Sequence, residues 1–115
     1  MRHLESVIQQ TCVEWFRLQY PQLALLLFAV PNGGARRKVE AQIMKAEGTT
    51  RGVSDLLLLF PAKHYHGLCI EMKSPKGKQQ PSQKIWQRKV EWAGYKYALC
   101  HSFDEFMSEV NGYLR

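Results

Sequence analysis

The sequence has few cysteines, no long apolar stretch and no leader-like start. Its three cysteines, Cys12, Cys69 and Cys100, are far apart and have apolar neighbours, which predicts buried free thiols and argues against a disulfide framework or a paired-cysteine metal site. The longest apolar run, residues 23–30, is much too short to cross a membrane. Residues 1–5 begin no apolar signal region. These absences predict a protein of the reducing cytoplasm that is not embedded in a membrane.

Acidic residues are also scarce, with ten Asp and Glu against sixteen Lys and Arg. The basic excess is concentrated in two segments: residues 73–96 carry seven cations and one anion, Glu91, and a second cluster is Arg36, Arg37 and Lys38. A polyanionic partner would explain this distribution. A solvated face that keeps the protein soluble would explain it equally well, so charge alone leaves both interpretations open.

The composition is that of a folded globular domain. Hydrophobic residues make up 45% of the chain and charged residues 23%, which argues against an intrinsically disordered protein. A chain of 115 residues can bury one core without a metal or disulfide staple. We therefore expect residues 1–115 to form a single stand-alone domain.

Hydrophobic periodicity and turn signals predict alternating helices and strands. In chain order the predicted elements are a helix over residues 1–20, a strand over 23–30, a helix over 35–47, strands over 53–60 and 68–73, a helix over 82–94, a strand over 96–100 and a helix from residue 102. The two strands in the middle are expected to form an antiparallel hairpin. The order αβαββαβα predicts an α/β fold in which helices flank a sheet.

The ends of the helices are marked by residues with restricted or special backbone preferences. Pro21 ends the first helix, Gly48 ends the second, and Gly94 ends the third, which is capped near Ser82. Ser102 opens a capping box for the last helix. The apolar side of this last helix consists of Phe103, Phe106, Met107, Val110 and Leu114.

One group of charged residues has the composition of a catalytic site. Asp55 directly precedes the apolar run 56–60, where a carboxylate is costly unless it is paired, hydrogen-bonded or metal-bound. In the next strand, Glu71 and Lys73 share a face because alternate strand residues point the same way. If the strands pair, Asp55 and Glu71 form a site of hard oxygen ligands that suits Mg²⁺ or Mn²⁺, beside an ammonium that can orient or help deprotonate a water.

Simpler interpretations of these residues remain open. Chance alone would place a Glu-x-Lys tripeptide in about half of all chains of this composition. Glu71 and Lys73 could form a surface ion pair while Asp55 caps a loop. Two further residues favour a site, because Gln83 lies on the same helix face as Trp86, Val90 and Ala93, and Glu14 borders the apolar stripe of the first helix.

In chain order, a set of short motifs resembles the VRR-NUC (virus-type replication-repair nuclease) family, a compact branch of the PD-(D/E)XK nucleases. The motifs are Glu14, Pro31-Asn32-Gly33, Gly52-Val53-Ser54-Asp55, Glu71-Met72-Lys73, Ser82-Gln83 and Gly94. The resemblance covers nearly the whole chain. It implies a restriction-endonuclease-like core with a mixed four-stranded sheet. The family usually has Pro directly before the Asp, whereas this chain has Ser54.

The resemblance also implies a metal-dependent endonuclease acting in DNA repair, recombination or replication. It implies Asp55, Glu71, the Met72 carbonyl and Glu14 as ligands of Mg²⁺ or Mn²⁺, with Lys73 and Gln83 completing the catalytic set. Stand-alone members are similar to homodimeric enzymes that resolve four-way (Holliday) junctions, and the family's association with bacteria and phages implies the cytoplasm of a bacterial or phage-infected cell.

Two further sets of residues extend this hypothesis. We expect the side chains of Arg36, Arg37, Lys38, Lys76 and Lys78 to contact DNA phosphates. Phe106, Met107 and Tyr113 could form the contact between two subunits, although burial in the monomer would explain them equally well.

Two alternatives to a nuclease differ in chemistry. A DNA-binding module could keep the nuclease fold without activity, but Asp55, Glu71 and Lys73 are all retained. A zinc site built on His64 and His66 does not fit, because no cysteine pair lies near them.

Overall fold

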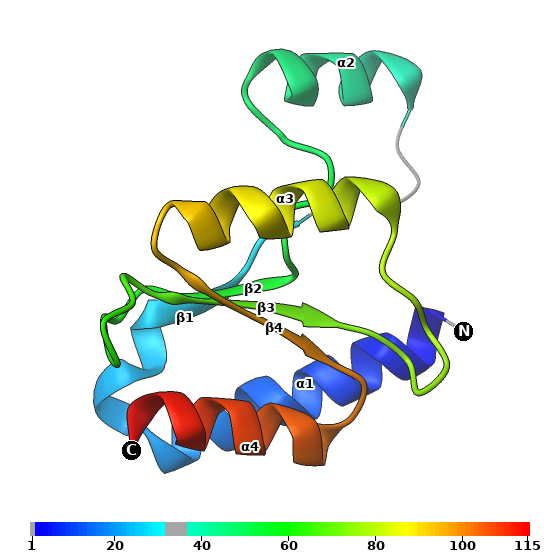
Figure 1. The fold of residues 1–115 in the computed structure, drawn as a ribbon. Helices are drawn as coiled ribbons and strands as arrows, with labels where there is room; N and C mark the ends of the chain where they lie inside the picture. The colour runs from blue at the N-terminus through cyan, green and yellow to red at the C-terminus, as the bar shows by residue number, and fades with distance from the viewer. Residues whose placement is uncertain (1, 32–36) are drawn as a thin grey trace.

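The computed structural model describes residues 2–31 and 37–115 (Figure 1). Its elements, in chain order, are α1 (Arg2–Gln19), the 3-10 helix η1 (Pro21–Leu26), β1 (Leu27–Ala29), α2 (Lys38–Ala46), β2 (Leu56–Leu58), β3 (Leu68–Met72), α3 (Pro81–Trp92), β4 (Lys96–Cys100) and α4 (Phe103–Leu114). Apart from η1, this is the predicted order αβαββαβα. No described helix is long and apolar enough to cross a membrane.

The four strands form one mixed sheet in the order β1-β2-β3-β4. The pairs β1–β2 and β2–β3 are antiparallel, which confirms the predicted central hairpin. Strand β4 runs parallel to β3, and α3 makes the crossover between them. The carboxyl end of β3 therefore lies beside the amino end of β2 and the carboxyl end of β4.

The two faces of the sheet are covered by different helices, α1 and α4 on one side and α3 on the other (Figure 1). Alternate residues of β3 divide between these layers: Ile70 and Met72 enter the core with α1 and α4, while Cys69 faces Trp86 and Val90 of α3. The core residues are Cys12, Phe16, Leu27, Leu56, Leu58, Leu68, Ile70, Met72, Ala98, Cys100, Phe106, Val110 and Tyr113. Cys12, Cys69 and Cys100 are buried free thiols, as predicted.

The predicted strand over residues 23–30 is wrong over most of its length. Pro21 begins a 3-10 helix that continues to Leu26, so β1 retains only Leu27–Ala29. Proline is favoured at the first position of a helical turn, and Leu23 and Leu26 both pack against the core from this turn. Apolar content alone does not distinguish a short buried helix from a strand.

The other predicted boundaries differ in smaller ways. Helix α2 begins at Lys38, and β2 contains only Leu56–Leu58. Gly48 and Gly94 have φ values of +111° and +98°, which suits the glycines that end α2 and α3. The residue that caps α3 is Gln80. Strand β4 has the predicted bounds, and Ser102 accepts a hydrogen bond from the Glu105 N–H, as expected for an N-cap.

Candidate active site

The site forms where β2 begins and β3 ends. Leu56 pairs with Ile70, so one further step of the same antiparallel register places Asp55 opposite Glu71. Oδ2 of Asp55 accepts a 2.7 Å hydrogen bond from the Met72 N–H. This contact continues the β2–β3 pairing through a side chain and fixes the aspartate at the end of β3.

Glu71 and Lys73 lie on the α3 side of the sheet and are both buried, with 3% and 9% of their surface exposed. Lys73 Nζ lies 3.8 Å from Glu71 Oε2. The same oxygen accepts a 3.0 Å hydrogen bond from Gln83 Nε2, and Gln83 Oε1 accepts a 2.7 Å bond from the Gln80 N–H. The first turn of α3 thus orients the Gln83 amide toward Glu71, and the predicted Asp55, Glu71, Lys73 and Gln83 come together.

The two carboxyl groups disfavour each other's charge. Burial, followed by the negative charge of Asp55, raises the pKa of Glu71 to about 8. Burial also raises the pKa of Asp55. The hydrogen bond from the Met72 N–H lowers this pKa, because it favours the charged carboxylate, but its effect is smaller than that of burial. Such a pair is stabilised in its charged form by a cation between or beside the carboxylates.

The unused hydrogen-bonding capacity of Glu71 fits such a cation. Within the described part of the chain, Glu71 Oε1 is buried and has no hydrogen-bond partner. The described residues contain no group of three or more His, Cys, Asp and Glu side chains placed to hold a metal. A site with two carboxylates suits Mg²⁺, which keeps several waters and uses one or two protein carboxylates. Asp55 and Glu71 are the side chains that could hold it, with the Met72 main chain beside them.

Helix α1 contributes an acid that the sequence did not single out. The negative charge of Glu5 raises the pKa of both Asp55 and Glu71. Glu14 does not appear among the charges that act on either carboxyl group. Its side chain is exposed, and it lies nine residues after Glu5, about 13.5 Å further along the helix axis. Glu5 is therefore the acid of α1 whose charge acts on the two site carboxyl groups, and the predicted Glu14 lies further along the helix.

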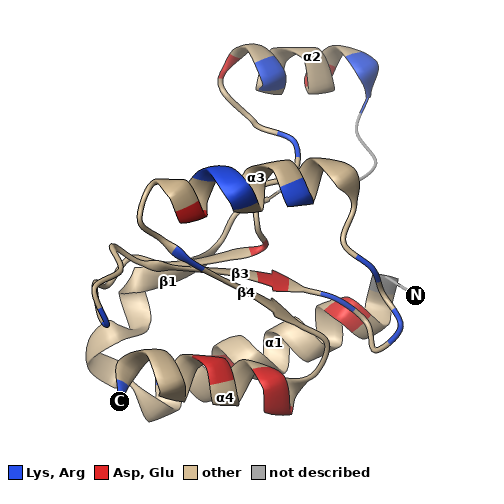
Figure 2. Cartoon of the chain, viewed as in Figure 1, with Lys and Arg blue, Asp and Glu red and all other residues tan. Residues whose placement is uncertain are grey.

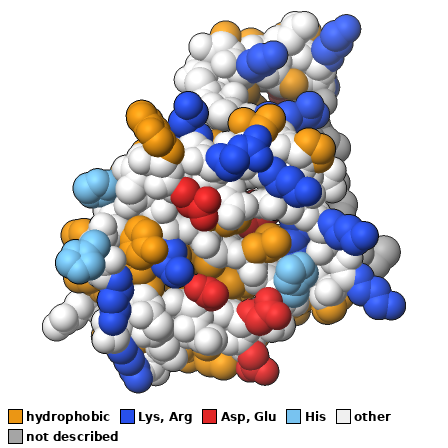
Figure 3. All heavy atoms as spheres, viewed as in Figure 1, with side chains coloured by type: hydrophobic (Ala, Val, Ile, Leu, Met, Phe, Trp, Pro, Cys, Tyr) orange, Lys and Arg blue, Asp and Glu red, His pale blue; other side chains and the backbone are white. Residues whose placement is uncertain are grey.

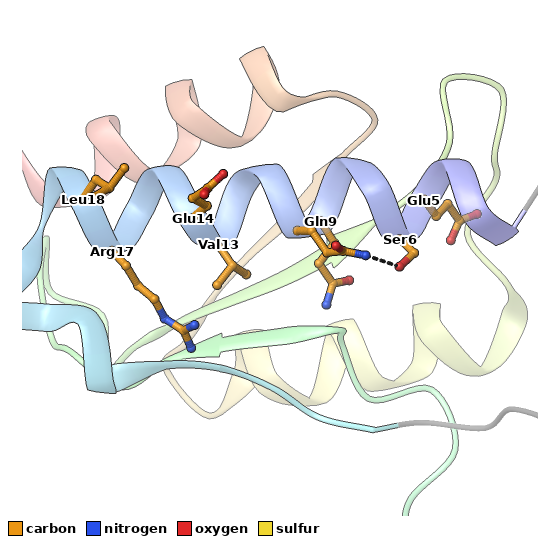
Figure 4. Close-up of a pocket in the computed structure, with 8 residues that line it drawn as sticks. Glu5, Ser6, Gln9, Val13, Glu14, Arg17 and Leu18 are labelled. Carbon is orange, nitrogen blue, oxygen red and sulfur yellow. Dashed lines mark hydrogen bonds between the residues drawn. The ribbon is translucent and has the colours of Figure 1, made fainter.

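The reason is the direction of the buried stripe of α1. Ile8 packs against the core, and Cys12 and Phe16 are part of it, so the stripe extended one turn toward the amino terminus reaches Glu5. Glu5 and Glu14 both line a groove along α1 with a cavity volume of about 750 Å³ (Figure 4). The groove is lined by Glu5, Ser6, Gln9, Gln10, Val13, Glu14, Arg17 and Leu18. An acid at the sheet-edge end of this stripe was the signal that could have identified Glu5.

The predicted phosphate contacts that the structure describes lie in two exposed segments. Lys76 and Lys78 are exposed in the loop between β3 and α3, and Arg37 and Lys38 are exposed at the start of α2. Arg36 lies outside the described residues, as do Asn32 and Gly33. Most of the Lys and Arg positions coloured in Figure 2 lie on α2, α3 and the loop before α3, and most of the basic side chains in Figure 3 gather on the same part of the surface. Acidic residues gather over α4. His64 and His66 are exposed in the turn between β2 and β3.

Comparison with known proteins identifies the domain family and the fold. The profile of the VRR-NUC domain matches residues 3–104. A solved structure described as a VRR_NUC domain protein superposes with a TM-score of 0.85 at 24% sequence identity, over 96% of this chain and 88% of that chain. No curated protein matches the sequence. The similarity to the solved structure confirms the predicted α/β fold with its mixed sheet.

Proposed function

Because the chain belongs to the VRR-NUC domain family, whose fold is that of a nuclease, we propose that it is a metal-dependent endonuclease that hydrolyses phosphodiester bonds in DNA. The observation that carries this proposal is the group formed by buried Glu71 and Lys73 with the half-buried Asp55. Its Glu71 keeps one oxygen without a protein partner and faces a second carboxyl group. Burial of a charged group is costly unless the group is paired, hydrogen-bonded or bound to a metal. Groups of this kind are therefore typical of functional sites.

Asp55 and Glu71 would hold Mg²⁺ or Mn²⁺, with the Met72 carbonyl as a third ligand. When bound, the ion supplies stabilisation for negative charge on the scissile phosphate and lowers the pKa of a water. Glu5 adds negative charge at this position, which favours binding of a cation over the empty site.

The remaining side chains position the reactants. Lys73, held beside Glu71, orients the attacking water, and its positive charge favours loss of the water's proton to solvent. Gln83 fixes Glu71 through one carboxylate oxygen and leaves the other free. A set of basic residues binds flanking phosphates and positions the DNA without reading its sequence. These residues are Lys76, Lys78, Arg36, Arg37 and Lys38.

The substrate that we propose is branched DNA, with a four-way junction as the chief candidate and a role in repair, recombination or replication. A junction needs two cuts and each chain has one site, so we propose a homodimer. Two of the three α4 residues predicted for its interface are not available: Phe106 and Tyr113 are 0% and 1% exposed, in the core of the monomer, whereas Met107 is partly exposed. The alternative of burial within the monomer is therefore the correct one for these two residues.

A different surface supports the dimer. Helix α2 stands apart above α3 in Figure 1 and has no buried residue. Nine-residue helices are marginal on their own, yet Val39 and Ile43 expose apolar surface on one side of it. The sheet also has an uncovered apolar area, at Phe28 and Leu59. Each chain offers both surfaces, so a two-fold exchange in which α2 of one copy covers the sheet of the other would bury all four residues twice.

The alternative function is a DNA-binding module with a nuclease fold and no activity. The complete set of Asp55, Glu71 and Lys73 favours catalysis over this alternative. The buried free thiols support a reducing compartment such as the cytoplasm.

The decisive experiment is to incubate the protein with labelled four-way junction, flap and linear duplex DNA in Mg²⁺, Mn²⁺ or EDTA. The variants are Glu71→Gln and Lys73→Ala, with Glu47→Gln and Lys45→Ala as exposed controls. We expect metal-dependent cuts that both site variants lose and both controls keep. Salt-sensitive DNA binding without cleavage by folded wild-type protein would instead identify the binding module.

A further inference from the structure

His101 connects the loop that follows Lys73 to helix α4. Its Nε2 lies 3.0 Å from the carbonyl oxygen of Gly77, and because a carbonyl oxygen only accepts, the ring nitrogen must donate. On the other side, Glu105 Oε1 lies 3.5 Å from His101 Nδ1 and accepts a 2.7 Å bond from the His101 N–H. The first turn of α4 thus holds His101, and His101 holds the tip of the loop.

Gly77 lies directly on the stem of Lys73. A Cβ atom added to Gly77 would be 3.2 Å from both Lys73 Cβ and Ser74 Oγ. The Gly77 N–H donates a 2.9 Å bond to the Ser74 carbonyl, which turns the loop back over Lys73. The Lys73 N–H in turn donates to the carbonyl of Cys100, the neighbour of His101. Lys73 is therefore enclosed between the end of β4 and the loop tip.

We propose that His101 is a positioning residue for Lys73: by holding the Gly77 carbonyl, it keeps the loop packed on the Lys73 stem and the ammonium beside Glu71. The inference rests on the proposed nuclease function for its effect on the reaction. A long side chain such as Lys has several rotamers to lose, and packing on its stem selects the one that places Nζ at the site. Loss of the contact frees these rotamers, so it slows cleavage more than it weakens binding.

Two conservative substitutions separate the nitrogen that matters from the bulk of the ring. In His101→Gln the amide nitrogen can occupy the place of Nε2 and donate to Gly77. In His101→Asn the shorter amide reaches only the place of Nδ1. His64→Asn is the matched control, because His64 is exposed in a distant turn and has a φ of +70°, which Asn tolerates.

The first readout is hydrogen exchange of the amides of residue 74 and residues 76–80 in metal-free protein, which does not depend on activity. The second is the single-turnover cleavage rate at saturating protein, with DNA affinity measured in EDTA. We expect His101→Asn to exchange faster in this loop and to cleave about 10- to 100-fold more slowly, as displacement of a catalytic group by about 1 Å does. DNA affinity should change little, and His101→Gln should resemble wild-type protein in all three measurements.

Gly77→Ala tests the same contact from the other side, since its new methyl group would push the loop away from Lys73 while His101 is intact. It should reproduce the slow single-turnover rate. Wild-type rates and exchange in His101→Asn, or equal losses in the Asn and Gln variants, would overturn the inference. If wild-type protein does not cleave DNA, the proposed function fails, and exchange alone still decides whether His101 holds the loop.

Discussion

The main-chain N–H of Met72 donates a 2.7 Å hydrogen bond to Oδ2 of Asp55, so the strand that carries Glu71 also orients the carboxylate that faces it. Hydrogen bonds to charged groups contribute roughly 1.5–3 kcal/mol, which offsets part of the cost of burying Asp55. Among the described residues no N–H group donates to Glu71 Oε1, and the Asp55 and Glu71 carboxyl groups can hydrogen-bond to each other only when one of them holds a proton. The hydrogen bonds of the folded protein therefore offset only part of the free-energy cost of placing these two carboxyl groups side by side.

The acidic pair should make stability depend on pH when no metal is present. The pKa of Glu71 rises from 4.5 to about 8 on folding, so the folded state binds more protons than the unfolded state between these values. Its contribution to stability is complete below about pH 4.5 and is lost as the pH rises toward 8. In EDTA we expect the free energy of unfolding to fall by roughly 2–4 kcal/mol over this range.

Urea unfolding at a series of pH values in EDTA measures this effect. Glu71→Gln should lose most of the decline, whereas the exposed control Glu47→Gln should keep it. Addition of Mg²⁺ should raise wild-type stability more at pH 8 than at pH 5.5, because protons compete with the ion for Glu71. Parallel curves for wild-type protein and Glu71→Gln would contradict the prediction.

Glu5 and Glu14 provide a matched pair on one helix. Glu5→Gln removes a negative charge that acts on both site carboxyls, so it should weaken binding of Mn²⁺ and raise the metal concentration needed for half-maximal cleavage. Glu14→Gln removes an exposed charge on the same helix and should leave both unchanged. Calorimetric titration with Mn²⁺ measures the first quantity. A larger loss in Glu14→Gln would restore Glu14 as the acid of the site.

The sequence predicted the centre of the site because local rules determine it. Strand alternation places Glu71 and Lys73 on one face, and a hairpin brings Asp55 back to them. Gln83 was accessible to the same reasoning, since its helix follows β3 closely in the chain. Each of these placements depends only on elements that are neighbours in the chain. None of them depends on the angle at which distant elements pack.

The position of Glu5 depends on such an angle. Helix α1 contacts β3 and α4 across the core, and only its crossing direction decides which turn reaches the sheet edge. The 3-10 helix η1 was missed for a related reason, because the contacts that Leu23 and Leu26 make with the core depend on tertiary packing that an apolar run does not specify. The position of α2, which lacks buried residues, is likewise set by no local pattern.

The proposed dimer predicts that one charge on α2 changes the oligomeric state. Ile43→Glu places a carboxylate on the exposed apolar side of α2 and should yield a monomer in sedimentation velocity experiments. Ala41→Glu adds the same charge on the opposite side of the helix and should leave the dimer intact. The monomeric variant should still nick DNA but should no longer make paired cuts in a junction. Wild-type protein that is monomeric at micromolar concentration would refute the dimer.

Gly52 connects the loop before Asp55 to the first turn of α3. It has a φ of +90°, and a Cβ atom there would lie 2.5 Å from the carbonyl oxygen of Ser82 and 3.2 Å from the nitrogen of Gln83. A methyl group cannot be accommodated unless the start of α3 moves, and that movement would carry Gln83 away from Glu71. Gly52→Ala should therefore lower both stability and the cleavage rate.

Gly48→Ala is the control that separates backbone strain from this clash. Gly48 also has a positive φ, +111°, but nothing lies within 4 Å of its added Cβ, so the substitution should cost only about 1–2 kcal/mol of left-handed strain. Thermal unfolding and single-turnover cleavage of the two variants should therefore differ. We expect Gly48→Ala to lose stability alone and Gly52→Ala to lose more stability and activity together. If both variants lose only the same stability, the close approach of Gly52 to α3 does not position Gln83.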